Sequence, residues 1–419
     1  MAETRMQTAL GGAERIGTFA ALKFLNFRLW FFGQTLSMMG TWMQSVAQGW
    51  LVYQLTGSEF ALGAVSFAGA LPTLFLMLPG GVLADRIEKR RLLLLTQGTM
   101  MILAFVLMVL ASQRGVLRIW HIVVLAIGLG IANSFDAPAR QAMAVEMVED
   151  RRYLMNAIAL NSTIFNMARV VGPAVGGAVL AALGAAWCFG LNGLSYVAVI
   201  IALLLMRFPP APAVTQRGAF VSEITDGVRY VWGQGLIRST ILLVSLASLF
   251  AGSFAVLLPA YAADVLKVGA AGLGGLNAGV GVGALAGSLI VASSGHFRRK
   301  GLILAAGALA YPIALLAFAG SRSLLISLVC LLVVGLAFVA QNSMANTIVQ
   351  SLVPDELRGR VMGFYMLTFF GTAPFGALQA GSLAQALGTR NAIAIDASLT
   401  LAISVTLLLA TPALRTLEI

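Results

Sequence analysis

Long apolar runs recur along almost the whole chain and constrain its fold more than any other feature. A helix needs about 20 apolar residues to cross a bilayer, and we place twelve such runs in the sequence. Inside lipid, every backbone N–H and C=O group needs a partner, so only helices and closed barrels can span it. These runs lack the alternating pattern of barrel strands, and we therefore predict an all-α membrane protein.

The twelve predicted spans are separated by short polar segments. They cover residues 28–54, 59–84, 92–112, 119–144, 156–182, 185–206, 236–263, 271–295, 301–320, 323–350, 360–388 and 391–413. Hydrophobic residues make up 59% of the chain and charged residues 10%, whereas soluble domains carry about 25% charged residues. The composition thus agrees with a multi-pass membrane protein.

The distribution of the basic residues predicts the orientation of the chain. A net charge of +11 suits a nucleic-acid partner only if the basic residues share one face, but here they lie in short loops between the spans. They concentrate in the loops on one side, such as the segment from Arg86 to Arg91. Cytoplasmic loops carry this excess, so both termini are predicted to be cytoplasmic, and no nucleic-acid partner is expected.

One longer connection divides the chain in two. It opens with the proline-rich "FPPAPAVTQRG" and continues with "AFVSEITDGVRYVWGQG". Phe220, Ile224, Val228 and Val231 share one helical face there, which predicts an amphipathic helix on the membrane surface. The expected organisation is an N-terminal tail (1–20), a six-helix bundle (21–206), a cytoplasmic linker (207–235), a second six-helix bundle (236–413) and a C-terminal tail (414–419). Duplicated halves are typical of secondary transporters, which bind substrate between them.

The loop after span two reads "GGVLADRIEKRRLL". An acid at a helix end followed by several bases can form ion pairs that lock neighbouring helices and release them when the helices move. The alternative is that the bases only anchor the topology. We predict a conformational latch formed by Gly81, Asp85, Arg86, Arg90 and Arg91.

Span five reads "FNMARVVGPAVGGAVL". Gly172 and Gly176 are four residues apart, as are Pro173 and Gly177, so small residues can allow a close helix contact. Proline in a spanning helix permits a bend. Ordinary helix packing is the alternative to a special role for this motif.

These two motifs carry a resemblance to a known family. The loop resembles the pattern G-x-x-x-D-R-x-G-x-R-R of the major facilitator superfamily, with Glu88 in place of the second glycine. Span five is similar to that superfamily's antiporter motif, which is associated with exporters. "DAPARQA" and "NAIALNSTIFNMARVVGP" resemble its branch of enterobactin exporters and macrolide efflux proteins, grouped with drug:proton antiporters. The resemblance spans essentially the whole chain and implies two pseudo-symmetric six-helix bundles and proton-coupled export across a bacterial inner membrane.

Polar side chains along the spans suggest where a substrate binds. In span one, Gln34, Ser37, Thr41, Gln44 and Gln48 share one helical face. In the superfamily, spans one, four, seven and ten line the central cavity. The expected cavity residues are Gln34, Met38, Thr41, Trp42, Gln44, Gln48, Phe250, Phe254, Asn342 and Asn346. Such a lining suits an amphipathic organic molecule, although each amide has interhelical hydrogen bonding as its alternative role.

Four charged residues inside the predicted spans are candidates for a role, and one of them, Asp396, lies about five residues from the outer end of span twelve, where a position near the membrane interface is the favoured interpretation. The other three lie deeper in spans four and five. Asp136 and Arg140 lie in "FDAPARQA" of span four, and Arg169 lies in span five. A charge at the bilayer centre costs about 2.5–3.5 kcal/mol, so it usually has a partner and a role. Helical rise places Asp136 between Arg140 and Arg169. We predict a cluster that either fixes spans four and five as an ion pair or carries the coupling proton.

Other functions have little support in the sequence. No cluster of His, Cys and Asp has metal-ligand spacing, and no G-x-x-x-x-G-K loop for ATP is present. We therefore expect no metal, no cofactor and no enzyme activity. The expected partners are an amphipathic small molecule, protons and the lipid bilayer, and the protein is expected to act as a monomer. The alternatives are movement of a lipid-like substrate, uptake, or a non-transporting membrane scaffold or sensor.

Overall fold

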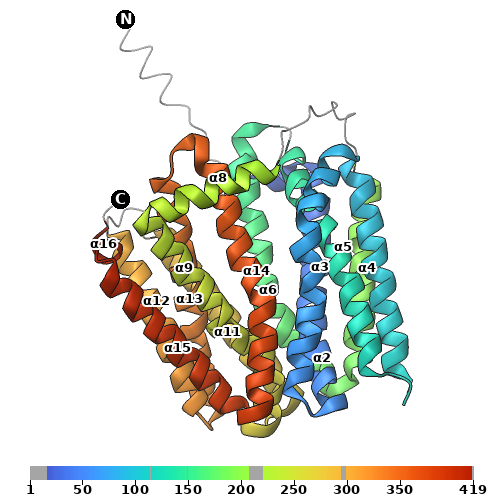
Figure 1. Ribbon diagram of the computed structural model, residues 1–419. Helices are drawn as coiled ribbons and strands as arrows, with labels where there is room; N and C mark the ends of the chain where they lie inside the picture. Colours follow the sequence, from blue (N-terminus) through green and yellow to red (C-terminus); the bar gives the residue numbers. More distant parts are fainter. Residues whose placement is uncertain (1–16, 114, 149, 207–219, 294–298, 418–419) are drawn as a thin grey trace, which may run out of the picture.

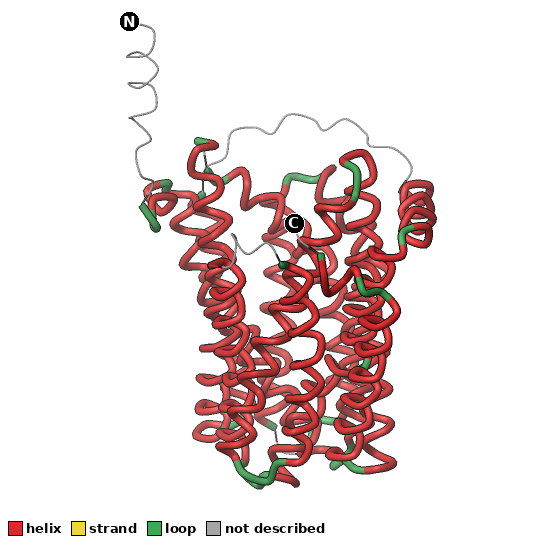
Figure 2. The backbone as a smooth tube through the Cα atoms, turned by 90° about the vertical axis from the view of Figure 1, so that its left-hand side faces the viewer, coloured by secondary structure: helices red, strands yellow, loops and turns green. Residues whose placement is uncertain are grey.

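The computed structural model describes residues 17–113, 115–148, 150–206, 220–293 and 299–417. In these ranges every regular element is a helix, and the long helices run along one common direction (Figures 1 and 2). Eleven of them are long and apolar enough to cross a membrane. The prediction of an all-α membrane protein is confirmed.

The long helices form two sets separated by α8 (Phe220–Gly233). The first set, called the N-half, is α2 (Leu25–Thr56), α3 (Glu59–Arg86), α4 (Lys89–Ser112), α5 (Ile119–Glu146), α6 (Leu154–Leu183) and α7 (Ala185–Leu205). The second set, the C-half, is α9 (Gly235–Leu249), α10 (Phe254–Ala260), α11 (Gly269–Ser293), α12 (Lys300–Gly320), α13 (Leu324–Leu352), α14 (Asp355–Leu387) and α15 (Thr389–Ala410). Short helical turns complete the chain: η1 (Ala20–Lys23), η2 (Arg151–Tyr153), η3 (Ala251–Ser253), η4 (Tyr261–Val265) and α16 (Ala413–Thr416).

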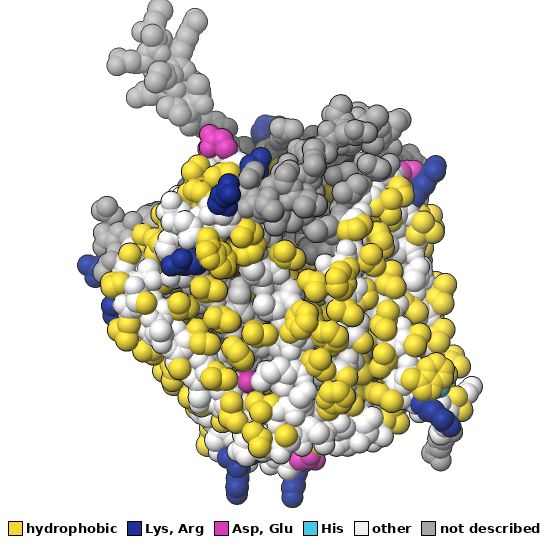
Figure 3. Space-filling view, in the orientation of Figure 1, with side chains coloured by type: hydrophobic (Ala, Val, Ile, Leu, Met, Phe, Trp, Pro, Cys, Tyr) yellow, Lys and Arg dark blue, Asp and Glu magenta, His cyan; other side chains and the backbone are white. Residues whose placement is uncertain are grey.

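The outer surface of the bundle matches a lipid environment. Large apolar side chains such as Leu95 and Leu325 are exposed on its sides. Figure 3 shows hydrophobic side chains covering the visible face, with Lys and Arg side chains near its two ends. Without water to drive association, such helices pack through close backbone contact and internal polar bonds.

Helix α2 occupies the place of predicted span one but is not among the eleven apolar helices. Its polar side chains point inward: Gln34, Ser37 and Gln44 are all buried. The helix packs against α6 and α7, and this interior position explains its lower apolar content. The total of twelve spans and the cytoplasmic termini therefore stay predictions.

Predicted span seven is one helical segment with irregular turns. The segment runs from α9 through η3 and α10 to the π-helical η4. Gly252 lies in η3, and Pro259 lies within α10. Irregular backbone at membrane depth is tolerated where it lines a cavity, and η3 lies beside the central cavity described below.

The two halves meet through glycines on two helix pairs. Helix α6 packs on α11, where a Cβ at Gly274 would lie 2.6 Å from the Cα of Gly177. Helix α3 packs on α14, where a Cβ at Gly381 would lie 3.0 Å from the Cα of Gly63. Real Cβ atoms essentially never approach within 3.0 Å of another heavy atom, so backbone meets backbone at these points.

Hydrogen bonds between the halves gather at the end of the bundle away from α8, which we call the outer end. The Tyr53 hydroxyl donates to the Asp264 carboxylate. The Ser58 hydroxyl donates to Gln385 Oε1 at 2.6 Å, and the Thr389 hydroxyl donates to Glu59 Oε1 at 3.1 Å. Both glycine pairs lie within about two turns of the same end. The outer end is therefore closed by backbone packing and by polar contacts.

Adjacent glycines of α11 allow a matched test of the α6–α11 contact. We expect Gly274→Val to lower the free energy of unfolding by about 1–3 kcal/mol, because the new methyl groups have no room against Gly177. Gly275→Val makes the same change where a Cβ meets nothing within 4 Å, and it should leave the unfolding midpoint nearly unchanged. Thermal unfolding of the purified variants measures both, and equal effects would contradict the backbone contact.

Candidate functional site

Two adjoining cavities lie between the N-half and the C-half. The first has a volume of about 360 Å³ and receives side chains from both halves, including Trp42, Arg169 and Tyr311. The second, of about 370 Å³, is lined mainly by α2, α3, α5, α10 and α11. Their shared wall consists of Trp42, Ser66, Ala255, Val256 and Asn277. Together they form one central cavity of the size and mostly apolar character typical of small-molecule sites.

A smaller side chamber of about 190 Å³ lies within the N-half. It is lined by Asp136 and Arg140 and shares Trp42 and Asn133 with the central cavity. The Trp42 indole thus separates the central cavity from the side chamber.

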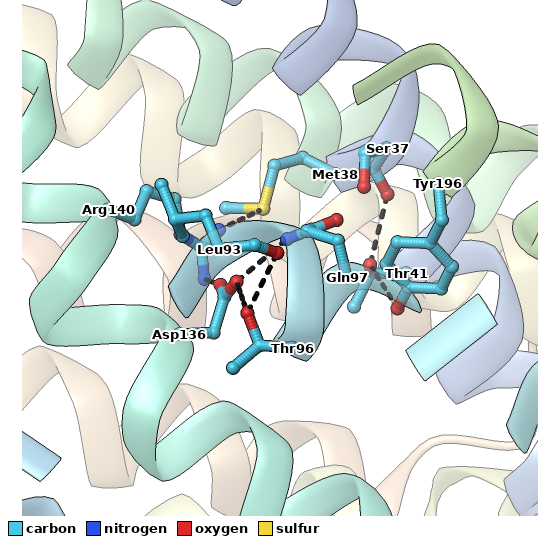
Figure 4. A network of polar contacts seen from close by, with 9 residues as sticks. All are labelled: Ser37, Met38, Thr41, Leu93, Thr96, Gln97, Asp136, Arg140 and Tyr196. Atoms are coloured by element: carbon cyan, nitrogen blue, oxygen red, sulfur yellow. Dashed lines mark hydrogen bonds and ion pairs between the residues drawn. The ribbon is translucent and has the colours of Figure 1, made fainter. Parts of the chain in front are cut away.

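Asp136 is the most enclosed acid of the described residues, with a side chain that is 1% exposed. Arg140 Nη2 lies 2.7 Å from Asp136 Oδ2, one turn along α5. Asp136 Oδ1 accepts hydrogen bonds from Thr96 Oγ1 at 2.9 Å and from Gln97 Nε2 at 2.8 Å, both on α4 (Figure 4). Three partners therefore stabilise the carboxylate where no bulk water reaches it.

Arg140 extends this network to α2. Its Nη1 contacts the Met38 sulfur at 3.4 Å, and its side chain is 22% exposed. The Thr41 hydroxyl nearby donates to the Ser37 carbonyl oxygen at 3.0 Å and lies 3.5 Å from the Tyr196 hydroxyl (Figure 4). The side chamber is thus bounded by α2, α4, α5 and α7, with Phe165 of α6 completing its lining.

Arg169 does not join this cluster, and the predicted position of Asp136 between two arginines is wrong. The Arg169 guanidinium carbon lies 5.9 Å from the centre of the Trp42 ring and 5.9 Å from that of the Phe338 ring, in the central cavity. Helical rise gives a position along the helix axis, but it cannot give the direction of a side chain around that axis. The Asp136–Arg140 pair is also internal to α5, so it does not tie span four to span five. Instead, Thr96 and Gln97 tie α5 to α4.

The predicted substrate residues divide into two groups. Trp42, Gln48 and Phe254 line the central cavity, while Met38 and Thr41 line the side chamber. The remaining five line none of these spaces: Gln34, Gln44, Phe250, Asn342 and Asn346.

Three of those five make hydrogen bonds within the protein, one between helices and two within α13. Gln44 Oε1 accepts from Asn192 Nδ2 at 2.7 Å, which joins α2 to α7. Asn342 donates to the Phe338 carbonyl oxygen at 2.8 Å, and Asn346 accepts from Gln350 at 2.6 Å. Interhelical hydrogen bonding therefore accounts for Gln44, whereas the bonds of Asn342 and Asn346 are local to α13 and support neither alternative.

Sequence reasoning missed several residues of the site. Asn277 and Ser66 line both parts of the central cavity, Tyr311 and Phe338 line its first part, and Asn133 lies between its second part and the side chamber. Asn277 is a lone amide in the glycine-rich "GGLNAGVGVG", and the pair "TQ" at Thr96 interrupts an apolar run. In both places, polar residues interrupt an otherwise apolar span, and this interruption could have been used to predict them as site residues.

The predicted latch is only partly visible. The side chains of Asp85 and Arg86 lie outside the described residues. Arg90 donates from Nε to the Leu203 carbonyl oxygen at 2.7 Å and from Nη2 to that of Leu204 at 2.9 Å, which caps the end of α7. Arg91 pairs with Glu88 at 2.7 Å. These contacts stay within the N-half, so a latch between the halves stays a prediction.

The prediction named Gly81 as the glycine of this motif, but in the structure it is the neighbouring Gly80 of α3 that makes a close contact. A Cβ at Gly81 would meet nothing within 4 Å, whereas one at Gly80 would collide with the Ser134 carbonyl oxygen on α5. Gly80 is thus the residue that lets α3 approach α5. Glu88 has φ −53°, which any residue adopts, so the turn does not need the glycine of the family pattern.

The antiporter-like motif places α6 between two neighbours. A Cβ at Gly172 would lie 2.7 Å from Trp42 Cβ, and one at Gly176 would lie 2.9 Å from Met43 Cα, both on α2. Gly177 faces Gly274 of the C-half, and Pro173 lines the central cavity. The motif therefore supports both the wall of the cavity and the contact between the halves.

Comparison with known proteins gives one consistent result. Residues 16–418 match the family described as "Transmembrane secretion effector". The chain is 27% identical over 358 residues to the multidrug efflux pump Tap of Mycolicibacterium fortuitum, covering 83% of this chain and 87% of Tap. It is 28% identical over 343 residues to the enterobactin exporter EntS of Shigella boydii, covering 81% of this chain and 80% of EntS.

Solved structures show the same fold at low sequence identity. A bacterial homologue of the human lysosomal transporter Spinster, in an inward-facing and unoccupied conformation, aligns with a TM-score of 0.70. It is 15% identical, and 97% of each chain is covered. The nucleoside transporter NupG aligns with a TM-score of 0.69 at 12% identity, covering 94% of this chain and 98% of NupG.

The contribution of the Asp136–Arg140 pair can be tested through the stability of the protein. We expect Arg140→Met to lower the free energy of unfolding by about 3–5 kcal/mol, because Asp136 then stays buried without its cation. The double variant Asp136→Asn with Arg140→Met should recover most of this loss. Arg358→Met breaks an exposed pair with Asp355 on α14 and should have little effect. Unfolding midpoints measure all three, and a double variant no more stable than Arg140→Met would contradict the pairing.

Proposed function

Because the chain belongs to the transmembrane secretion effector family of the major facilitator superfamily, we propose that it exports an amphipathic small molecule by alternating access. The observation that carries the proposal is the central cavity, which is walled by both halves and lies inside closed outer contacts. The relatives named as a multidrug efflux pump and an enterobactin exporter support the direction of transport.

The outer contacts suit a gate that opens and closes. Each hydrogen bond between the halves contributes about 0.5–1.5 kcal/mol net, because water replaces it on opening. No side chain is interlocked at the glycine contacts, so the helices can separate there without a side-chain rearrangement. A few such hydrogen bonds and backbone contacts can keep the outer end closed. When the halves move, they can be replaced by contacts at the opposite end of the bundle.

The placement of the protein follows from the same observations. As a multi-pass protein of the bacterial inner membrane, it has α8 and both termini on the cytoplasmic side in this proposal, in line with the basic loops. Helix α8 packs on the end of α14, where Gly227 faces the Arg360 backbone (Figure 1). We also propose that it acts as a monomer, with no cofactor and no catalysed reaction.

Proton entry is the proposed driving force, and Asp136 is the proposed carrier. Protonation neutralises Asp136 and removes its attraction for Arg140, which is then free to turn away from α5. Arg140 touches Met38 on α2, and Trp42 lies one turn further along that helix. The protonation state of Asp136 can therefore alter the wall that the side chamber shares with the central cavity. A membrane potential of 100 mV supplies about 2.3 kcal/mol per charge moved.

Transport in proteoliposomes tests the export proposal. We expect one or more members of a panel of drugs, siderophores and lysolipids to move against a gradient and to cause proton flux in the opposite direction. Transport without proton flux would remove the coupling proposal but keep export. A protein that transports no member and shows no ligand-dependent thermal shift would favour a scaffold or sensor.

Two buried aspartates allow a matched test of the coupling residue. Asp396 on α15 is also buried, but its carboxylate accepts from Gln379 Nε2 at 3.0 Å and has no basic partner among the described residues. We expect Asp136→Asn to reduce pH-gradient-driven transport to the level of protein-free liposomes while substrate exchange without a gradient continues. Asp396→Asn should keep gradient-driven transport. Unchanged gradient-driven transport in Asp136→Asn would overturn the role of Asp136.

A further inference from the structure

Arg169 is a partly buried cation with no ion pair among the described residues. Its side chain comes from α6 and lines the first part of the central cavity, about halfway along the helix. No aspartate or glutamate is among the residues that line either part of that cavity. The contacts of its guanidinium are the faces of Trp42 from the N-half and Phe338 from the C-half.

This lack of an acid sets Arg169 apart from the other charges within the helices. Asp136 and Arg140 neutralise each other, and Asp396 has an amide partner. Charged residues within a membrane usually pair with one another or mark a ligand pathway. Since the Arg169 side chain lines the cavity, its missing partner is best supplied by a molecule that enters the cavity.

The surroundings of Arg169 define what that molecule looks like. A guanidinium offers several N–H donors in one plane, which fit the paired oxygens of a carboxylate or a similar anion. Trp42 and Phe338 present apolar ring surfaces beside it, against which a planar body can stack. Asn277, Ser253 and Tyr311 line the same cavity and add a few polar groups.

We propose that Arg169 is the anion-binding residue of the central cavity, and that the transported molecule combines an acidic group with a planar apolar body. The acidic group pairs with the guanidinium, and the body lies between the aromatic side chains of the two halves. This inference rests on the proposed function and narrows its substrate class to organic anions. Organic cations are disfavoured because they would bring a second positive charge next to Arg169.

Two fluorescent probes test the site because they share one aromatic body. 1-Anilinonaphthalene-8-sulfonate carries a sulfonate, and N-phenyl-1-naphthylamine is the same body without it. Binding is measured by energy transfer from tryptophan to the probe, with the full-length protein in phosphatidylcholine nanodiscs. Empty nanodiscs give the background, and the zwitterionic lipid removes anionic headgroups as competing occupants. We expect the wild-type protein to bind the sulfonate more tightly than the neutral probe.

Variants of Arg169 separate charge recognition from folding. We expect Arg169→Gln to weaken binding of the sulfonate at least about tenfold, or about 1.4 kcal/mol, and to change binding of the neutral probe less than about twofold. Arg169→Lys keeps the charge and should retain part of the sulfonate binding. Arg322→Gln removes one exposed positive charge at the outer end and should change neither. Unaltered binding of the neutral probe shows that the variant is folded.

The outcomes distinguish this inference from the export proposal. Equal binding of the two probes by the wild-type protein, or equal loss of both in Arg169→Gln, overturns the anion site and leaves export untouched. Selective loss of the sulfonate in a protein that transports no compound supports the anion site and overturns export.

Discussion

Close backbone packing between the two halves is the constraint on which the rest of the structure depends. Gly177 against Gly274, and Gly63 against Gly381, bring four helices together near the outer end. The same contacts fix the position of α6, whose other glycines seat it on α2. With α6 held in this way, Pro173 and Arg169 on that helix face the central cavity. The antiporter-like motif is therefore a packing element that also positions a charged residue of the site.

The polar groups inside the helices fall into two classes. Gln44 with Asn192, and Asp136 with Arg140, Thr96 and Gln97, are bonded within the N-half and hold α2, α4, α5 and α7 together. Arg169 is bonded to no acid of the described residues and faces a space large enough for a small molecule. The first class holds the helices of the N-half together and includes the proposed proton carrier Asp136. A partly buried cation without an acidic partner is costly, so Arg169 indicates a binding site.

The sequence predicted the helices well because length and apolar character are summed over many residues. Each predicted span coincides with a helix, or for span seven with the series from α9 to η4, to within a few residues at most boundaries. Contacts of single side chains were harder, because one residue around a helix changes direction by about 100°. Gly80 and not Gly81 meets α5, and Arg169 faces the central cavity and not Asp136. The polar stripe of α2 likewise serves two neighbours: Gln44 faces α7 and Gln48 faces the central cavity.

Asp136 and Arg169 lie in separate spaces that share the Trp42 wall, and this separation has an energetic consequence. If one proton enters on Asp136 and one anion leaves from Arg169, two charges move in the favourable direction for a membrane that is negative inside. A potential of 100 mV then contributes about 4.6 kcal/mol, twice the value for one charge, or somewhat more than three orders of magnitude in concentration ratio. If both charges shared one ion-pair cluster, Arg169 would be neutralised by Asp136 and could not offer its charge to a substrate. Keeping the two apart allows the proton site and the anion site to be occupied independently, while the single indole between them gives each a way to influence the other.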